Sequence, residues 1–242
     1  MSIKRLMADI QQISYSKDNY NPDYSYYYDY DEADIKKGFL LLLGVENTPY
    51  FGGFYFLQTT FPENYPFSPP VMKFLSNDGK TRFNPNLYRP HSTPLFDGKV
   101  CLSILNTWGE STYSQAQRFM SVVETMRAHL FHENPLSNEP AYESYKLTNP
   151  DNKIYADILT YQNLNFNVYS NIVKTPEYAL PFKQIMIDNF NINKDYFKKY
   201  IDDNKHLHGK TIQIKYDDQS ITYNFEILES RFNEILEVCN NK

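Results

Sequence analysis

The segment from residue 38 to residue 75 constrains the fold most, because it alternates short apolar runs with turn-forming residues. Residues 39–45, 54–61 and 71–75 are the runs, and they are separated by Gly52-Gly53 and by a stretch that contains four prolines between positions 62 and 70. Short β-favouring runs bounded by Gly and Pro predict consecutive strands. The tyrosine-rich residues 26–30 predict a further edge strand, because aromatic side chains favour pleated surfaces. We therefore expect a four-stranded antiparallel meander.

Helices are expected to flank this sheet. In residues 3–13, Ile3, Leu6 and Ile10 recur at helical spacing. A second helix is expected after Ser114, which is a suitable N-cap, and before Pro135. Its apolar stripe, at i, i+3 and i+4 spacing, consists of Phe119, Val122, Val123, Met126 and Leu130.

The chain changes character at about residue 150. Helices are predicted over residues 151–174, 176–189, 193–201 and 226–239, with a β-hairpin within 210–225 around the turn 217–220. The predicted fold class is therefore α+β. Residues 1–148 form the core domain, and residues 149–242 form a mainly helical C-terminal extension.

Charge and cysteine content exclude several classes of protein. The net charge is −5 without clustered Lys and Arg, which argues against a nucleic-acid partner. The two cysteines, Cys101 and Cys239, form neither a disulfide framework nor a zinc-site spacing, so we expect a reducing compartment and no metal or cofactor. Residues 1–15 lack a signal-peptide core, and the longest apolar run is too short to cross a bilayer. We expect an intracellular monomer, cytoplasmic or nuclear, without a membrane partner.

Three segments between Tyr65 and Trp108 carry the chemistry. They read Tyr-Pro-Phe-Ser-Pro-Pro at 65–70, Arg-Phe-Asn-Pro-Asn-Leu-Tyr at 82–88, and Gly-Lys-Val-Cys-Leu-Ser-Ile-Leu at 98–105. This ordered set resembles the ubiquitin-conjugating enzyme family over roughly the first 145 residues. The wording at 82–88, at 101–108 and at 138–143 is similar to that of large members such as the Bruce/Apollon-type conjugating domain. Those members also continue in helices beyond the core.

The resemblance implies that Cys101 is the nucleophile. A conjugating enzyme accepts ubiquitin from the activating enzyme as a cysteine thioester, and passes it to a substrate lysine or to a ligase cysteine. A thiolate suits this task, since it attacks acyl carbons well and leaves well. A lone buried cysteine would instead be read as a small apolar residue. The presence of Asn86 and of the segment starting at Gly98 favours a catalytic role for Cys101.

Two further residues are implied in catalysis. Asn86 corresponds to the family's catalytic asparagine, whose amide donates to the oxyanion formed when lysine attacks. It is equally suited to bracing its loop, and the two roles are compatible. Glu133 is the positional candidate for the acidic group that orients and desolvates the lysine, although a solvated loop glutamate is the commoner situation. Asn84 stands where most members have His. Residues 89–96 are an insertion that either gates the thiol or is a plain surface loop.

Partner surfaces are implied as well. Lys4 and Arg5 resemble the basic positions that meet the activating enzyme, although a solvated helix face reads equally well. Phe67 and Pro66, with Tyr113 and Ala116, correspond to the ligase-binding surface, and the Tyr65-Pro66 bond is expected to be cis. The family often has Trp-Ser-Pro-Ala before its long helix. This chain has Tyr-Ser-Gln-Ala at 113–116, which puts binding of ordinary RING-type ligases in doubt.

Another class of function is a non-catalytic ubiquitin-binding or scaffold protein built on the same fold. The departures at Asn84, at Gln115 and in the 89–96 insertion motivate it, whereas the presence of Cys101 argues against it. A hydrolase is a weaker hypothesis, because none of the five histidines has a triad partner evident in the sequence.

Overall fold

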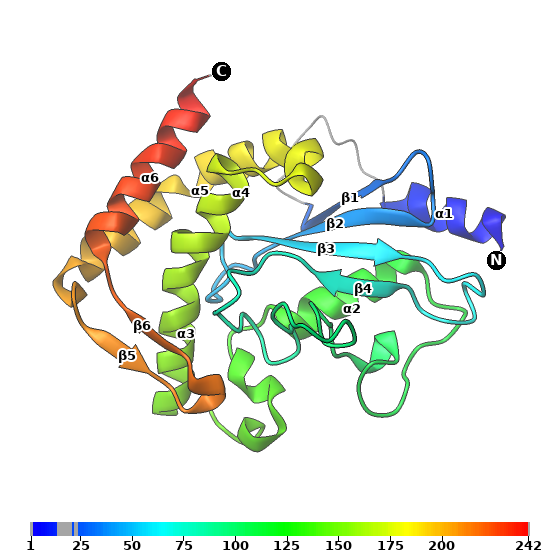
Figure 1. The fold of residues 1–242 in the computed structure, drawn as a ribbon, viewed down its shortest axis with the longest axis horizontal. Helices are drawn as coiled ribbons and strands as arrows, with labels where there is room; N and C mark the ends of the chain where they lie inside the picture. The colour runs from blue at the N-terminus through cyan, green and yellow to red at the C-terminus, as the bar shows by residue number, and fades with distance from the viewer. Residues whose placement is uncertain (1, 14–20, 22–23, 242) are drawn as a thin grey trace.

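A computed structural model describes residues 2–13, 21 and 24–241 of the chain. Its centre is a four-stranded sheet in the order β1-β2-β3-β4, with every neighbouring pair antiparallel, which confirms the predicted meander (Figure 1). The strands are β1 (Tyr26–Tyr30), β2 (Lys37–Leu43), β3 (Phe54–Thr60) and β4 (Val71–Phe74).

Two helices of the core domain lie where the periodicity predicted them. α1 (Ile3–Ile13) buries Leu6 and Ile10, and α2 (Phe119–Leu130) buries all five residues of its apolar stripe. The predicted N-cap of α2 is wrong, because the helix begins after Arg118. Ser114 instead opens a separate turn, in which the Gln117 amide donates to the Ser114 carbonyl at 2.9 Å.

The extension is mainly helical, as predicted, but its boundaries differ. The expected helix over 151–174 is present as α3 (Pro150–Gln162), a π-helical turn η4 (Asn163–Val168) and α4 (Tyr169–Val173). The two helices expected between 176 and 201 are replaced by a 3-10 turn (Glu177–Phe182) and a single helix α5 (Lys183–Asn204). The helix continues through residues 190–192, and the Asn193 side chain donates to the Asn189 carbonyl of the preceding turn at 3.0 Å.

The predicted hairpin and final helix close the chain. The hairpin strands β5 (Thr211–Gln213) and β6 (Ser220–Thr222) are shorter than expected, since Tyr216 lies in the turn between them. The last helix, α6 (Phe225–Asn240), begins at Phe225 because Asn224 caps it, its side chain accepting from the Ile227 amide at 3.0 Å. Among the described residues, none of the helices is both long and apolar enough to cross a membrane.

The extension gathers at one end of the sheet, opposite the end where α1 lies (Figure 1). Buried residues of the core domain and of the extension belong to one hydrophobic cluster. Polar contacts reinforce this junction. Asn167 accepts from the Phe54 amide at 2.6 Å and donates to the Phe54 carbonyl at 2.9 Å. Gly53 is required there, because a Cβ atom at this position would lie 2.1 Å from Asn163 Oδ1.

Candidate active site

Two short paired segments bring Cys101 and Asn86 together. The Cys101 amide donates to the Asn86 carbonyl at 2.8 Å, and the Tyr88 amide donates to the Lys99 carbonyl at 2.9 Å. Between these bonds, Leu87 and Val100 form an antiparallel bridge. Asn86 therefore lies opposite Cys101, as the resemblance to a conjugating enzyme implied.

Gly98 allows the cysteine segment to run close beside β4. Its φ angle is +64°, in the left-handed region that favours glycine. A Cβ atom there would lie 2.6 Å from the Phe74 carbonyl oxygen. The Phe74 amide in turn donates to the Gly98 carbonyl at 2.7 Å. The Gly-x-x-Cys spacing thus reflects a backbone crossing that only glycine permits.

Asn84 holds the loop that carries Asn86. Its buried amide group donates to the Leu130 carbonyl at 2.8 Å and to the Tyr50 hydroxyl at 3.3 Å. Its oxygen accepts from the Asn86 amide at 2.9 Å and from Asn138 Nδ2 at 3.2 Å. Four partners satisfy the full capacity of an asparagine amide. Asn84 therefore braces the loop, and Asn138, which the motif reading had not assigned to the site, completes the brace.

The Asn86 side chain itself is left available. The residue is 9% exposed, and its backbone makes the bonds to Asn84 and Cys101. Within the described part of the chain, no hydrogen-bond partner is found for its side-chain amide. The bracing role thus falls to the Asn86 backbone, which leaves the amide group free to donate to a substrate oxygen.

The thiol of Cys101 lies in a well-ordered and closed setting. The residue is only 2% exposed. Thr107, which the sequence reading did not assign to the site, ties the chain on both sides of it. The Thr107 hydroxyl donates to the Val100 carbonyl at 2.6 Å and accepts from the Leu102 amide at 2.8 Å. A large acyl donor therefore requires a local opening before the thiol can attack it.

Glu133 is not placed with this pair. Its side chain is exposed and lines a cavity of about 360 Å³ between the turn at residues 46–51 and the extension, whose Ala156, Thr160 and Tyr196 form the other wall. Neither Cys101 nor Asn86 lines that cavity.

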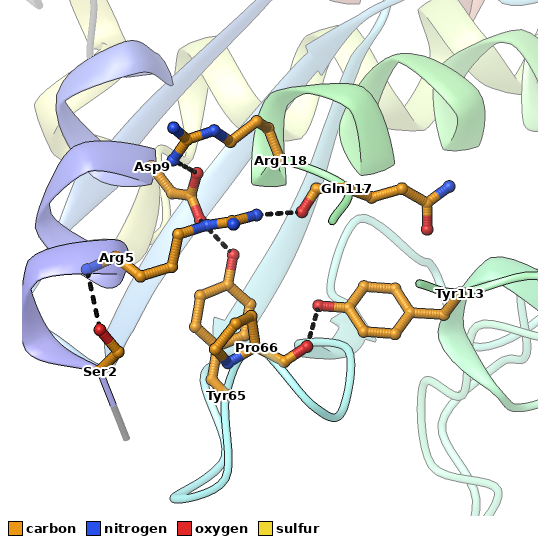
Figure 2. Close-up of polar contacts among 8 residues, drawn as sticks. All are labelled: Ser2, Arg5, Asp9, Tyr65, Pro66, Tyr113, Gln117 and Arg118. Atoms are coloured by element: carbon orange, nitrogen blue, oxygen red, sulfur yellow. Dashed lines mark hydrogen bonds and ion pairs between the residues drawn. The ribbon is translucent and has the colours of Figure 1, made fainter. Parts of the chain in front are cut away.

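The two basic residues predicted for the activating enzyme differ in their surroundings. Lys4 is exposed, whereas the Arg5 side chain turns inward (Figure 2). Arg5 Nε donates to the fully buried Asp9 at 2.7 Å, and Arg5 Nη2 bonds the Gln117 carbonyl. Asp9 also accepts from the Tyr65 hydroxyl at 2.5 Å and from Arg118 Nη1 at 3.1 Å. Burial and the bond to Asp9 raise the pKa of Tyr65 above its ordinary value. We call these four side chains the Asp9 network.

The predicted ligase-binding residues do come together beside the Asp9 network. The Tyr113 hydroxyl donates to the Pro66 carbonyl at 2.9 Å (Figure 2). Phe67 is 73% exposed and Ala116 is exposed. The Tyr65-Pro66 bond is cis, as expected. The loops at 62–68 and 113–118 therefore present one surface, on which Phe67 is an exposed apolar side chain.

The 89–96 insertion is anchored at its start. Arg89 donates to the Lys80 carbonyl at 2.6 Å and, through Nη2, to Asp217 in the hairpin of the extension at 2.9 Å. The sequence reading had taken Asp217 and Gln219 as turn residues only. Their contacts with the core domain could not be predicted, because no local sequence pattern indicates them.

Comparisons with known proteins agree with these motifs. A family model described as "Ubiquitin-conjugating enzyme" matches residues 5–162. The human "Ubiquitin-conjugating enzyme E2 Z" is 32% identical over 202 residues, which covers 83% of this chain and 54% of that protein. The Xenopus tropicalis protein of the same name is 31% identical over 206 residues, covering 85% of this chain and 63% of the relative. The chain thus spans less than two thirds of these relatives.

Other matches are more partial. Human BIRC6, the Bruce/Apollon-type "Dual E2 ubiquitin-conjugating enzyme/E3 ubiquitin-protein ligase", is 39% identical over 120 residues, but that covers 48% of this chain and 2% of BIRC6. The predicted kinship with this type is thus supported for part of the chain only. A solved E2 domain from Toxoplasma gondii superposes with a TM-score of 0.50 at 22% identity, covering 69% of this chain and 99% of that domain. This likeness concerns the fold.

Proposed function

This chain belongs to the ubiquitin-conjugating enzyme family, and from that premise we propose that it carries ubiquitin as a thioester on Cys101. It would accept ubiquitin from the activating enzyme, and transfer it to a substrate lysine or to a ligase cysteine. The observation that carries this proposal is the pairing of Cys101 with Asn86, whose side-chain amide remains available. Residues 1–148 would act as the conjugating core and 149–242 as its extension.

In the charging step, the Cys101 thiolate attacks the carbonyl carbon of the ubiquitin thioester on the activating enzyme. The new C–S bond forms as the bond to the activating enzyme breaks, and that enzyme's thiolate leaves. One thioester replaces another, so the step needs little general-base help. This agrees with a site built from a cysteine and an asparagine rather than a Cys-His pair.

In the lysine step, a neutral amine attacks the Cys101 thioester and forms a tetrahedral oxyanion. The Asn86 amide would donate to that oxyanion, an interaction whose loss typically costs about 3–4 kcal/mol of transition-state stabilisation. The intermediate collapses with the Cys101 thiolate as leaving group, and the amine proton passes to a base or to water. Glu133, which lines a cavity beside the turn at residues 46–51, remains the predicted helper for the incoming lysine.

Two groups of residues near the surface are assigned to partner proteins. Lys4, with Arg5 behind it, would contribute to the surface for the activating enzyme, and Phe67, Pro66, Tyr113 and Ala116 to the surface for a ligase. These reactions occur among intracellular proteins, which is where we expect the chain to act.

A charging assay tests the proposal directly. After incubation with activating enzyme, ubiquitin and ATP, we expect an adduct on a non-reducing gel that thiols remove. Cys101→Ser should trap an oxyester that resists thiols, while Cys239→Ser should still form the thioester. The absence of any thiol-sensitive adduct with a compatible activating enzyme would overturn the proposal. Ubiquitin binding without charging would favour the scaffold function instead.

Discharge to free lysine tests the remaining residues. Asn86→Ala should charge normally but lose lysine transfer by about 100- to 1,000-fold. Asn191→Ala, on α5, serves as the matched control and should behave as the unmodified chain. Normal discharge by the Asn86 variant would remove Asn86 from the mechanism. Glu133→Gln should slow discharge without changing charging, and an unchanged discharge rate would remove Glu133.

A further inference from the structure

The extension contacts the loop that carries Asn86, and this contact suggests a role for it. We define the catalytic loop as residues 78–88. Resting on the proposed function, we propose that the extension positions Asn86 for lysine transfer, with Gln219 and Tyr155 as positioning residues that act through Arg82. The extension would thereby be part of the acyl-transfer machinery rather than an appended module.

The first support is the backbone of Arg82. Its N–H donates to Gln219 Oε1 at 2.7 Å, and its carbonyl accepts from the Tyr155 hydroxyl at 2.7 Å. Gln219 is 5% exposed and Tyr155 fully buried. Both main-chain polar groups of one loop residue are thus satisfied by extension side chains. Buried backbone groups rarely go unpaired, so this point of the loop depends on the extension for its conformation.

The second support is the path from Arg82 to Asn86. Arg82 Nη2 donates to the Pro85 carbonyl at 2.7 Å, immediately before Asn86. The same guanidinium lies 3.8 Å from the centre of the Tyr88 ring, just beyond Asn86. The Arg82 side chain therefore restrains both flanks of Asn86. A shift of the Arg82 backbone would be passed directly to the peptide that carries the catalytic amide.

Core-domain residues brace the loop on both sides of Arg82, and the Tyr50 hydroxyl donates to the neighbouring Phe83 carbonyl at 2.7 Å. Among the described residues, the hydrogen bonds of the Arg82 backbone itself are those to Gln219 and Tyr155. Asp78 accepts from the Thr81 amide at 2.6 Å and holds the start of the loop. Asn84 holds its end through the Asn86 amide. Arg82 lies between these two braces. Gln162, also in the extension, adds a bond to the Thr81 hydroxyl at 3.1 Å.

The hairpin tip is a tight turn that is held against the core domain. Asp217 and Asp218 both have positive φ angles, +56° and +47°, and the Gln219 amide donates to the Tyr216 carbonyl at 3.3 Å. This is the pattern of a type I′ hairpin turn, and aspartate tolerates it better than most residues. Here Asp217 pairs with Arg89, and the Tyr216 ring packs edge-on against Tyr155 with ring centres 5.6 Å apart. The tip is thus held in the form that brings Gln219 to Arg82.

Three hairpin variants test the role of Gln219. Gln219→Ala removes the acceptor for the Arg82 N–H. Gln219→Glu keeps an acceptor oxygen for the Arg82 N–H, and it replaces the Nε2 group, which has no partner among the described residues, with a second carboxylate oxygen. Thr222→Ala removes the Thr211–Thr222 hydroxyl pair of the same hairpin, away from the loop. All are first charged with ubiquitin, and lysine discharge is then followed in a single turnover.

We expect Gln219→Ala to charge at the unmodified rate and to discharge about tenfold more slowly, with Gln219→Glu restoring discharge and Thr222→Ala leaving it unchanged. In an Asn86→Ala background, Gln219→Ala should have no further effect on discharge, because its influence passes through that amide. Equal losses in charging and discharge, additive losses in the double variant, or unchanged discharge in Gln219→Ala would each overturn the inference. Failure of the unmodified chain to charge would instead overturn the proposed function.

Discussion

At both ends of the sheet, side-chain hydrogen bonds hold surface loops in place, but the residues that make these bonds come from different parts of the chain. At the end near α1, the Asp9 network holds the loops at 62–68 and 113–118 with side chains that all precede residue 119. At the other end, the catalytic loop is contacted by Gln219 and Tyr155 from the extension. The comparison teaches that the first surface is held by neighbouring segments, whereas the loop that carries Asn86 is also held by Gln219, which lies beyond the residues that the family model matches.

Asp9 should show the largest effect on stability. Asp9→Ala removes a buried carboxylate and leaves Arg5 and the Tyr65 hydroxyl without their acceptor, so we expect about 3–5 kcal/mol less free energy of unfolding. Urea denaturation measures this. Asp203→Ala is the matched control, because Asp203 is exposed and, among the described residues, pairs only with Lys199 one helical turn away. A loss below about 1 kcal/mol would show that the network does not hold this end of the fold.

Substitutions at Arg5 and at Lys4 should distinguish an effect on stability from an effect on partner binding. Arg5→Ala removes charge-assisted bonds to Asp9 and to the Gln117 carbonyl, which should cost about 1.5–3 kcal/mol in urea denaturation and weaken ligase binding. Lys4→Ala should leave stability unchanged and slow charging by the activating enzyme at limiting concentrations. Equal effects of the two substitutions on charging, with no difference in stability, would mean that Arg5 is a surface contact after all.

A substitution of Tyr155 tests the end of the sheet where the extension lies. Tyr155→Phe removes the hydroxyl that bonds the Arg82 carbonyl, so we expect about 1–3 kcal/mol less stability together with slower lysine discharge. Tyr161→Phe is the control on the same helix α3, because its hydroxyl bonds the Asn224 carbonyl at 3.3 Å, within the extension. Both variants should lose stability, but only the Tyr155 variant should slow discharge. Equally slow discharge in both would favour general destabilisation.

The Arg89–Asp217 pair should have the smallest effect. Its side chains are 32% and 23% exposed, so a double-mutant cycle should give a coupling of about 0.2–1 kcal/mol that weakens in salt. Asp217→Asn is the suitable partner variant, because asparagine tolerates the left-handed conformation of the turn. Thermal or urea unfolding of Arg89→Lys, Asp217→Asn and the double variant measures the coupling. A value above about 2 kcal/mol, insensitive to salt, would make this pair a principal anchor of the insertion.

Much of the fold was predictable because its signals are local. Strand alternation, the Gly52-Gly53 turn and the stripe on α2 each arise within a few residues, and the structure confirms them. The single helix α5 was not predicted, because the apolar periodicity was taken to stop between residues 189 and 193, where the structure continues as one helix. Residues four apart share a helix face, so the sequence is compatible with an Arg5–Asp9 pair. Only the structure, in which Asp9 is buried, shows that Arg5 points inward.

The sequence by itself led to the proposal that Cys101 is the nucleophile, because Cys101, Asn86 and Gly98 lie in short segments whose order and spacing are specific. The tertiary structure alone decided what holds those segments. Gln219 reaches the Arg82 amide across 137 positions of the chain, and Asn163 donates from the extension to the Phe51 carbonyl at 2.9 Å. Such contacts join one side chain to a distant backbone group. They leave no periodicity in the sequence, and they exist only once packing has brought the two parts of the chain together.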